Sequence, residues 1–86
     1  MAVYEMFLSK VALKQLASLP PFIHNKIIED ISALSSSPRP PGCKKLKGYK
    51  NAWRIRVGDY RVVYEIEDKI LRILVIAIGH RKDVYE

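Results

Sequence analysis

The segment Ala52–Val63, which reads A-W-R-I-R-V-G-D-Y-R-V-V, constrains the fold more than any other part of the sequence. Two alternating runs are separated by Gly58-Asp59, a residue pair typical of two-residue β-hairpin turns. In this register Val57 faces Tyr60, and every second side chain along both strands lies on one apolar face. The segment therefore predicts a β-hairpin around which the other elements are arranged.

The opposite face of this predicted hairpin carries Arg54, Arg56 and Arg61. Arg56 stands directly across from Arg61, and like charges in such a cross-strand pair are destabilising, by a few tenths of a kcal/mol up to about 1 kcal/mol. An external polyanion that binds this face would offset the repulsion. The alternative is a solvated strand face, on which the arginines extend separately into water.

Basic residues are concentrated in this part of the sequence. The chain has 86 residues, 15 Lys and Arg, 9 Asp and Glu and a formal net charge of +6. Eight of the basic residues lie between Arg39 and Arg61, against one acidic residue, Asp59. Such a patch predicts an anionic partner: nucleic acid, an acidic protein, or both.

Length and composition predict a single small domain over residues 1–86, with a hydrophobic fraction of 49% that suffices for one modest core. The single cysteine, Cys43, cannot form an internal disulfide, and the first residues carry no secretory-signal pattern. The longest apolar run, Ile73–Ile78, is too short to span a bilayer. We therefore expect a cytoplasmic protein with no membrane contact. Since the two histidines and one cysteine are scattered, we expect no metal and no other cofactor.

The first half of the chain predicts one strand and two helices. Val3–Leu8 alternates in a way that suits a largely buried first strand. A short helix follows, with Ser9 as its N-cap, and it ends at Pro20-Pro21. Proline also suits the start of the second helix, Pro21–Ser35, so the two helices form an antiparallel helical hairpin.

The second half predicts loops and further strands. Ser35–Cys43 is a turn-rich connector, and Lys44–Asn51 is a basic loop anchored by Leu46. After the hairpin, a turn at Glu67–Lys69 leads into Ile70–Ile78, a nearly continuous apolar run typical of a central strand buried on both faces. The order β-α-α-β-β-β predicts an α+β domain, in which the helical hairpin packs on a twisted, mainly antiparallel four-stranded sheet.

Several blocks of residues, in a fixed order, carry a family resemblance: Leu46–Gly48, Trp53–Val57, Gly58–Tyr64, Gly79–Arg81 and Val84–Tyr85. In these blocks the chain resembles the RelE/ParE toxin superfamily of bacterial toxin–antitoxin systems, most closely its RelE-type branch. The resemblance implies the RelE-like microbial RNase fold and a ribosome-dependent endoribonuclease that cuts mRNA in the A site without a metal. It also implies a cognate antitoxin, encoded beside the toxin, whose acidic toxin-binding segment wraps around it.

Such cleavage proceeds by attack of the 2′-hydroxyl on the neighbouring phosphate, and it needs a base, charge stabilisation and an acid. By matched position, the resemblance implies that Arg61 and Arg81 bind the phosphate in the transition state, with Arg54 and Arg56 beside them. Tyr85 matches the family's C-terminal tyrosine, which stacks on a base or takes part in proton transfer. A further set would hold the backbone of mRNA or ribosomal RNA: Lys44, Lys45, Lys47, Tyr49 and Lys50.

The general base is not evident from the sequence. Some relatives carry lysine where this chain has Arg54 and Arg56, and a guanidinium cannot give up its proton. His80 is the natural substitute, because an imidazole exchanges a proton near neutral pH and other branches place a catalytic histidine in this region. The alternative is that His80 lies at the rim of the site and contacts RNA or the antitoxin.

Two other functions fit the same resemblance. A ParE-like member would poison DNA gyrase without nuclease activity, and a catalytically inactive member would only bind RNA or sequester the antitoxin. The basic patch favours the nuclease, because binding to gyrase does not require a set of phosphate-binding arginines.

Overall fold

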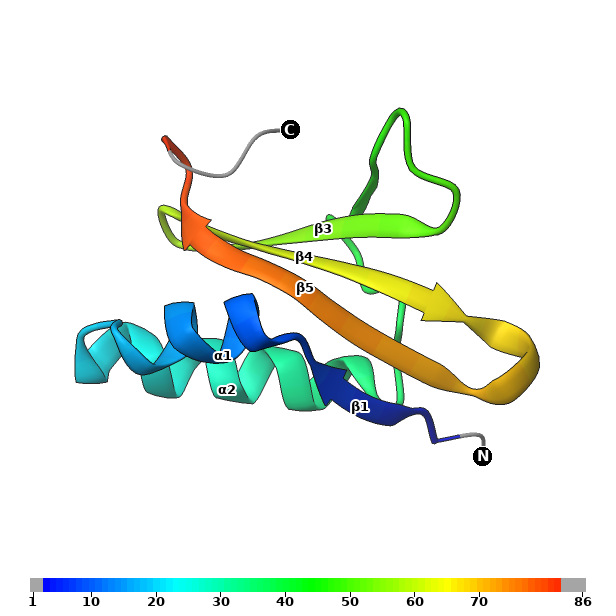
Figure 1. Ribbon diagram of the computed structural model, residues 1–86, viewed down its shortest axis with the longest axis horizontal. Helices are drawn as coiled ribbons and strands as arrows, with labels where there is room; N and C mark the ends of the chain where they lie inside the picture. Colours follow the sequence, from blue (N-terminus) through cyan, green and yellow to red (C-terminus); the bar gives the residue numbers. More distant parts are fainter. Residues whose placement is uncertain (1–2, 83–86) are drawn as a thin grey trace.

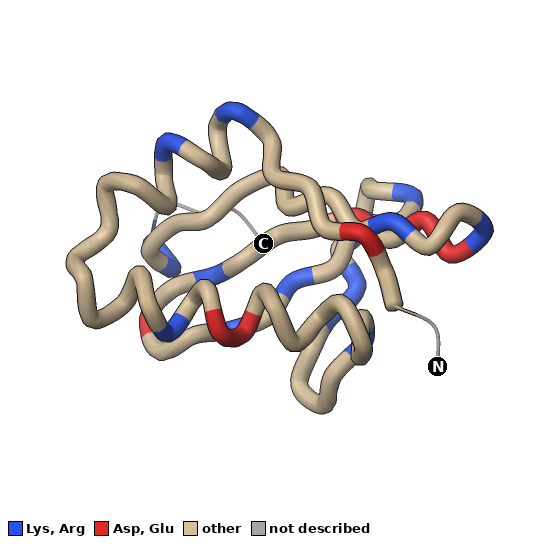
Figure 2. Tube along the Cα trace, turned by 90° about the horizontal axis from the view of Figure 1, so that it is seen from below, with Lys and Arg blue, Asp and Glu red and all other residues tan. Residues whose placement is uncertain are grey.

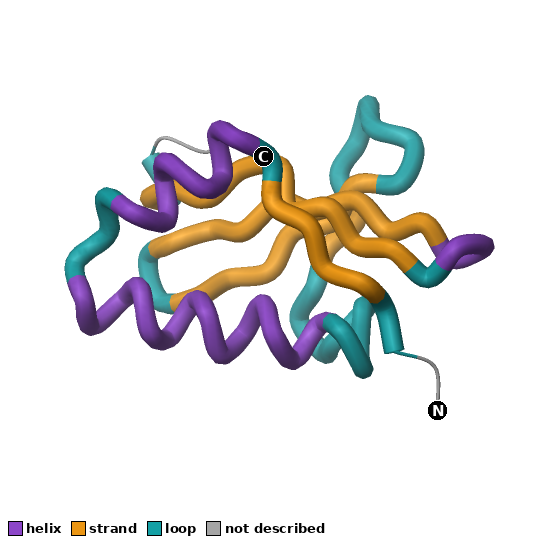
Figure 3. The backbone as a smooth tube through the Cα atoms, turned by 60° about the horizontal axis from the view of Figure 1, so that its bottom comes forward, coloured by secondary structure: helices purple, strands orange, loops and turns teal. Residues whose placement is uncertain are grey.

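The structure, a computed structural model, describes residues 3–82 and is an α+β fold of two layers. Figure 1 shows both helices beneath one face of a sheet, and Figure 3 shows the same separation from another side. The elements follow in the order β1 (Glu5–Leu8), α1 (Lys10–Ala17), α2 (Pro21–Leu34), β2 (Lys44–Lys45), β3 (Ala52–Val57), β4 (Tyr60–Glu67), a 3₁₀ turn (Asp68–Ile70) and β5 (Arg72–His80). No helix within residues 3–82 is long and apolar enough to cross a membrane.

The strands form one sheet in the order β1-β5-β4-β3-β2, in which β1 runs parallel to β5 and the other neighbours are antiparallel. The predicted hairpin is confirmed, with Val57 opposite Tyr60 and Arg56 opposite Arg61. Gly58 has φ of +62°, the conformation that the first residue of a type II′ turn requires. The turn therefore fixes the register in which the arginines face each other.

The sheet has five strands where the sequence predicted four. Lys44 and Lys45, expected in a loop, form β2 and pair with Arg54 and Trp53 of β3. A two-residue strand is made by backbone hydrogen bonds, so its side chains carry no periodic pattern that could reveal it. The α+β class and the helical hairpin are as predicted.

The first and the last predicted strands are less buried than the sequence suggested. The first strand is shorter than expected and is an edge strand, in which Glu5 and Phe7 are exposed while Met6 and Leu8 are half-buried. The last strand begins only at Arg72, and in it only Ile73, Val75 and Ile78 are buried. The helices cover one face of the sheet, so full burial on both faces is confined to the central strands β3 and β4.

The core lies between the helices and this covered face. Its helical residues come from two apolar stripes, and its strand residues from alternate positions of β3 and β4 and from both sides of the register shift in β5: Ala12, Leu16, Ile27, Ile31, Leu34, Ile55, Val57, Val62, Tyr64, Ile66, Ile73, Val75 and Ile78. Trp53 and Tyr60 pack against this core from its edge. Their aromatic rings are therefore structural.

Helix α1 completes the edge of β5 beyond the point where β1 ends. Ser9 caps the helix by accepting a hydrogen bond from the Ala12 amide at 3.0 Å, and its hydroxyl donates to the Ile76 carbonyl at 3.1 Å. The Gln15 side-chain oxygen accepts from the Ile78 amide at 2.6 Å. These contacts satisfy backbone groups of β5 that no strand pairs there, and they hold the strand that leads to Gly79 and His80.

Candidate active site

Basic side chains gather on the face of the sheet opposite the helices, which we call the open face. The β3–β4 register sets Arg56 opposite Arg61, and the β2–β3 register sets Lys44 opposite Arg54. Two like-charged cross-strand pairs therefore adjoin on this face, each unfavourable by a few tenths of a kcal/mol up to about 1 kcal/mol. The predicted placement of the three strand arginines is confirmed, and β2 adds Lys44 to them.

These cations differ in burial. Arg54 and Arg61 are only 5% and 6% exposed, whereas Arg56 is exposed. One guanidinium nitrogen of Arg61, Nη1, donates to the carbonyl of Tyr60 at 3.2 Å. Arg54 and Arg61 are thus held within the protein surface and do not extend into water, which excludes the solvated-face alternative for these two residues.

An apolar strip lies beside the arginines on the same face. It consists of the buried residues Leu46, Ala52 and Val63, with Ile76 and Ala77 packed against them. This apolar surface lies next to the arginines on the open face. Interactions of the arginines with a bound anion are stronger where water is excluded.

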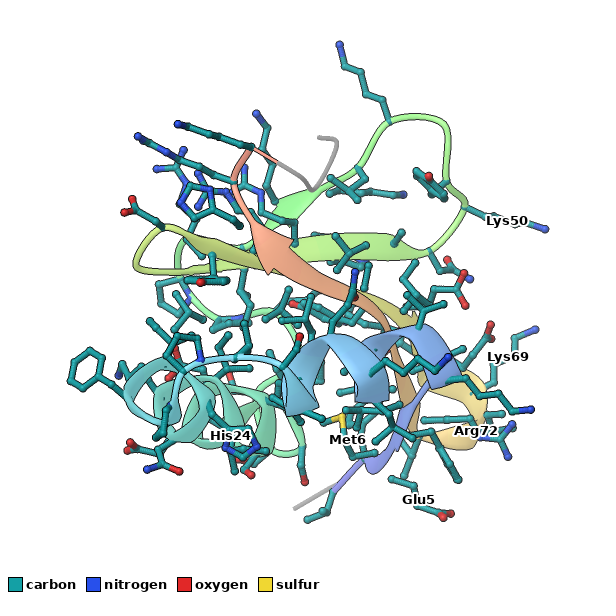
Figure 4. The ribbon with its side chains drawn as sticks, turned by 60° about the vertical axis from the view of Figure 1, so that its left-hand side comes forward. Glu5, Met6, His24, Lys50, Lys69 and Arg72 are labelled. Carbon is teal, nitrogen blue, oxygen red and sulfur yellow. The ribbon has the colours of Figure 1, made fainter. Side chains whose placement is uncertain are left out.

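A loop over residues 47–51 rises from this strip. Its base is closed by a hydrogen bond from the Leu46 amide to the Ala52 carbonyl, 2.9 Å long. Lys47, Tyr49 and Lys50 are all exposed on it. Figure 4 shows the Lys50 side chain extending outward from the loop, to the right of the sheet in this view. The loop therefore presents two cations and one aromatic ring at the end of β3 away from the Gly58-Asp59 turn.

The end of β5 brings Arg81 to the tip of the β3–β4 hairpin. Gly79 pairs with Arg61 on the open face, and Arg81 follows two residues later. The Arg81 amide donates to the Asp59 carbonyl at 2.7 Å, and its Nε lies 3.9 Å from Asp59 Oδ1. Arg61 and Arg81, expected to act together, are thus joined to the same end of the sheet.

The His80 side chain leaves the sheet on the face opposite to that of Arg61. It pairs with Tyr60, whose ring it meets edge-to-face at 5.5 Å between ring centroids, on the face that packs against the helices. Its Nδ1 accepts a hydrogen bond from the Lys82 amide at 3.2 Å. A neutral imidazole that accepts at Nδ1 carries its proton on Nε2. In this arrangement the ring is a donor, and it must give up the Lys82 contact to accept a proton at Nδ1.

Two further cations of the basic segment belong to a separate cluster around Trp53. Lys45 pairs with Trp53, so it lies on the opposite side of the sheet from Lys44, with its ammonium 6.0 Å from the ring centroid. The Arg39 guanidinium lies 5.0 Å from the same centroid and forms an ion pair with Asp68 at 2.8 Å. The sequence did not distinguish these two residues from the cations of the open face.

Acidic residues lie mainly elsewhere. Figure 2 shows them along α2 and around the end of the sheet where β4 meets β5. The ones at these two places are Glu29 and Asp30 on α2, and Glu5, Glu65, Glu67 and Asp68 toward that end of the sheet. Most of the described acidic residues are therefore separated from the cations of the open face. Asp59 differs from them, because it lies at the hairpin tip.

Tyr85 lies outside the described residues. His24 is half-buried on α2, in the helical layer (Figure 4), and is therefore remote from the open face. Within residues 3–82, no group of three or more His, Cys, Asp or Glu side chains is placed to hold a metal ion.

Comparison with known proteins identifies the class to which this fold and basic face belong. The model of the ParE toxin of the type II toxin–antitoxin system, parDE, matches residues 6–85. The chain therefore belongs to this family of toxins, as its resemblance predicted.

Within the family, the relatives are of the RelE type. The putative toxin RelE1 of Methanocaldococcus jannaschii is 33% identical, over 96% of each chain. A putative RelE-like toxin protein of Escherichia coli is 31% identical over 95% of this chain and 90% of that one. The RelE chain in the archaeal RelE–RelB complex from Pyrococcus horikoshii matches with a TM-score of 0.83 at 29% identity, covering 98% of this chain and all (100%) of that one.

Proposed function

We propose that this RelE-type toxin is an endoribonuclease that cleaves mRNA in the A site of the ribosome. One observation carries the proposal: adjacent like-charged pairs, Lys44 with Arg54 and Arg56 with Arg61, occupy the open face. Like charges in such cross-strand pairs repel each other. A phosphate backbone bound across these pairs would offset the repulsion, because arginine forms bidentate, permanently charged contacts with phosphate oxygens.

The reaction places a defined demand on these side chains. The 2′-hydroxyl loses its proton as its oxygen bonds to phosphorus, and the 5′-oxygen takes up a proton as its bond to phosphorus breaks, which leaves a 2′,3′-cyclic phosphate and a free 5′-hydroxyl. Negative charge rises on the phosphoryl oxygens in between. Arg61, held by burial, and Arg81, held at the hairpin tip, stabilise that charge, while Arg54 and Arg56 bind the flanking backbone.

The arginines of the site take no part in proton transfer. Arginine keeps its proton, so the four arginines act by charge and orientation. The ribosome then supplies much of the rate by holding the 2′-hydroxyl in line with the bond that breaks. His80, which lies at the end of β5 and not on the open face, donates a hydrogen bond from Nε2 at the rim of the RNA site, and Tyr85 stacks on a base or takes part in proton transfer.

The remaining contacts are to RNA and to a second protein. Lys44, Lys47 and Lys50 bind phosphates, Tyr49 stacks on an exposed base, and Lys45 contributes charge from the side of the sheet. Several solved relatives are complexes with RelB antitoxins, including RelBE2 of Mycobacterium tuberculosis. A cognate antitoxin with an acidic segment would cover the same cations, and the toxin would act where ribosomes are, in the cytoplasm.

Primer extension on mRNA from cells that express the chain tests this function. We expect new 5′ ends within translated codons, and far fewer of them when Arg61→Ala or Arg81→Ala is expressed at the same level. Both variants should still bind the antitoxin. The matching family model is that of the ParE toxin, so inhibition of DNA gyrase is the second candidate function. Induction of the SOS response without mRNA cuts would support gyrase inhibition and refute the nuclease.

A further inference from the structure

The tip of the β3–β4 hairpin holds the end of β5 residue by residue. Arg61 pairs with Gly79, and Tyr60 pairs with His80 and meets its ring. The next position on the hairpin is Asp59, the second residue of the turn. Although β5 ends at His80, the backbone contact continues for one more residue, because the Asp59 carbonyl accepts a hydrogen bond from the Arg81 amide.

Asp59 contacts Arg81 in two ways. Its carbonyl accepts from the Arg81 amide at 2.7 Å, and its carboxylate lies 3.9 Å from Arg81 Nε. Both side chains are largely exposed, 66% for Asp59 and 57% for Arg81. The contact engages Nε, at the root of the guanidinium, and leaves the two terminal nitrogens to approach a phosphate as a fork.

We infer that Asp59 is a positioning residue for Arg81, an inference that rests on the proposed function. The reasoning comes from charge. A carboxylate beside a phosphate site weakens binding of RNA, so Asp59 opposes the first step of the proposed reaction. Its benefit lies in the geometry of Arg81, whose long side chain would otherwise sample many rotamers at an exposed strand end.

This role gives a signature that a purely electrostatic or structural role would not give. In Asp59→Asn the repulsion of RNA is removed, so KM for programmed ribosomes should stay equal or fall. The orientation of Arg81 is lost, so kcat should fall about tenfold, within the range that misplacement of a catalytic group produces. The turn itself is preserved, because Gly-Asn suits the same two-residue hairpin as Gly-Asp.

The experiment measures kcat and KM of mRNA cleavage on programmed ribosomes for the parent, Asp59→Asn and Glu29→Gln. Glu29 is an exposed acidic residue on α2, so its variant removes the same charge away from the open face. We expect the split between kcat and KM in Asp59→Asn, with parental values for Glu29→Gln. A kcat equal to that of the parent, or the same fall in both variants, would overturn the inference.

A double-mutant cycle separates this inference from the function on which it rests. Once Arg81→Ala removes the guanidinium, Asp59→Asn should have no further effect on kcat. An equal tenfold fall in that background would overturn the positioning role and leave the nuclease standing. A parent protein that cuts no mRNA on ribosomes would instead refute the proposed function, and this inference with it.

Discussion

Replacement of Arg56 by threonine should make the protein more stable and less active. Arg56 is exposed and directly opposite Arg61, so its removal leaves no cavity and relieves one like-charged pair. Threonine is well suited to a strand. A relief of about 0.5 kcal/mol, in the middle of the range for cross-strand pairs, raises Tm by about 2–4 °C in a domain of this size.

A matched control has the opposite expectation. Arg72 also lies in a strand, but it faces Glu67 and its guanidinium lies 5.2 Å from the ring centroid of Phe7. Arg72→Thr therefore removes favourable contacts and should lower Tm or leave it unchanged.

Thermal unfolding followed by circular dichroism, at low salt and in 1 M salt, measures both variants. At 1 M the screening length is about 3 Å, so the gain from Arg56→Thr should shrink. Cleavage on programmed ribosomes should fall in the same variant, because a phosphate contact is lost. An Arg56→Thr protein that is less stable than the parent at low salt would refute the reasoning, as would a gain that persists in 1 M salt.

Three further substitutions have defined expectations. Tyr64→Phe removes the hydrogen bond from the buried hydroxyl to the Pro38 carbonyl, 2.7 Å long, and should lower the free energy of unfolding by about 1 kcal/mol in urea titrations. The hydrogen bond from Arg39 is the main cause that holds the pKa of Asp68 below its usual range, so the contribution of Asp68 to stability is present at neutral pH and is lost as the pH falls through that lowered pKa. Asp68→Asn should therefore flatten the acid side of a stability–pH curve, and an unchanged curve would contradict the network. His80→Gln retains a donor and should cleave faster than His80→Ala in single-turnover assays, whereas equal, large losses would indicate proton transfer through the imidazole.

The parts of the fold that sequence could predict are those set by local pattern. The register of the hairpin follows from its period-two alternation and from Gly58-Asp59, and the N-cap at Ser9 follows from its position before an apolar stripe. The resemblance in spaced blocks supplied the family. These signals are local or ordered along the chain, so they can be read without knowing which strands are neighbours.

The parts that could not be predicted depend on contacts between distant segments. Lys44 joins the open face because two residues of β2 pair with β3, which no periodicity reveals. His80 lies on the other face because β5 pairs with β4 in a register shifted near Val63 and Tyr64. The contact of Asp59 with Arg81 likewise requires the end of β5 to lie beside the hairpin tip, which only the assembled sheet provides.

The central claim is that the cations of the open face bind an RNA phosphate while its own 2′-hydroxyl attacks it. The most direct measurement is single-turnover cleavage by the purified protein on ribosomes programmed with either all-ribose mRNA or mRNA carrying one 2′-deoxy sugar on the 5′ side of the scissile phosphate. We predict cleavage of the first, with a 2′,3′-cyclic phosphate end, and none of the second. Equal cleavage of both messages, or of neither, would contradict the account.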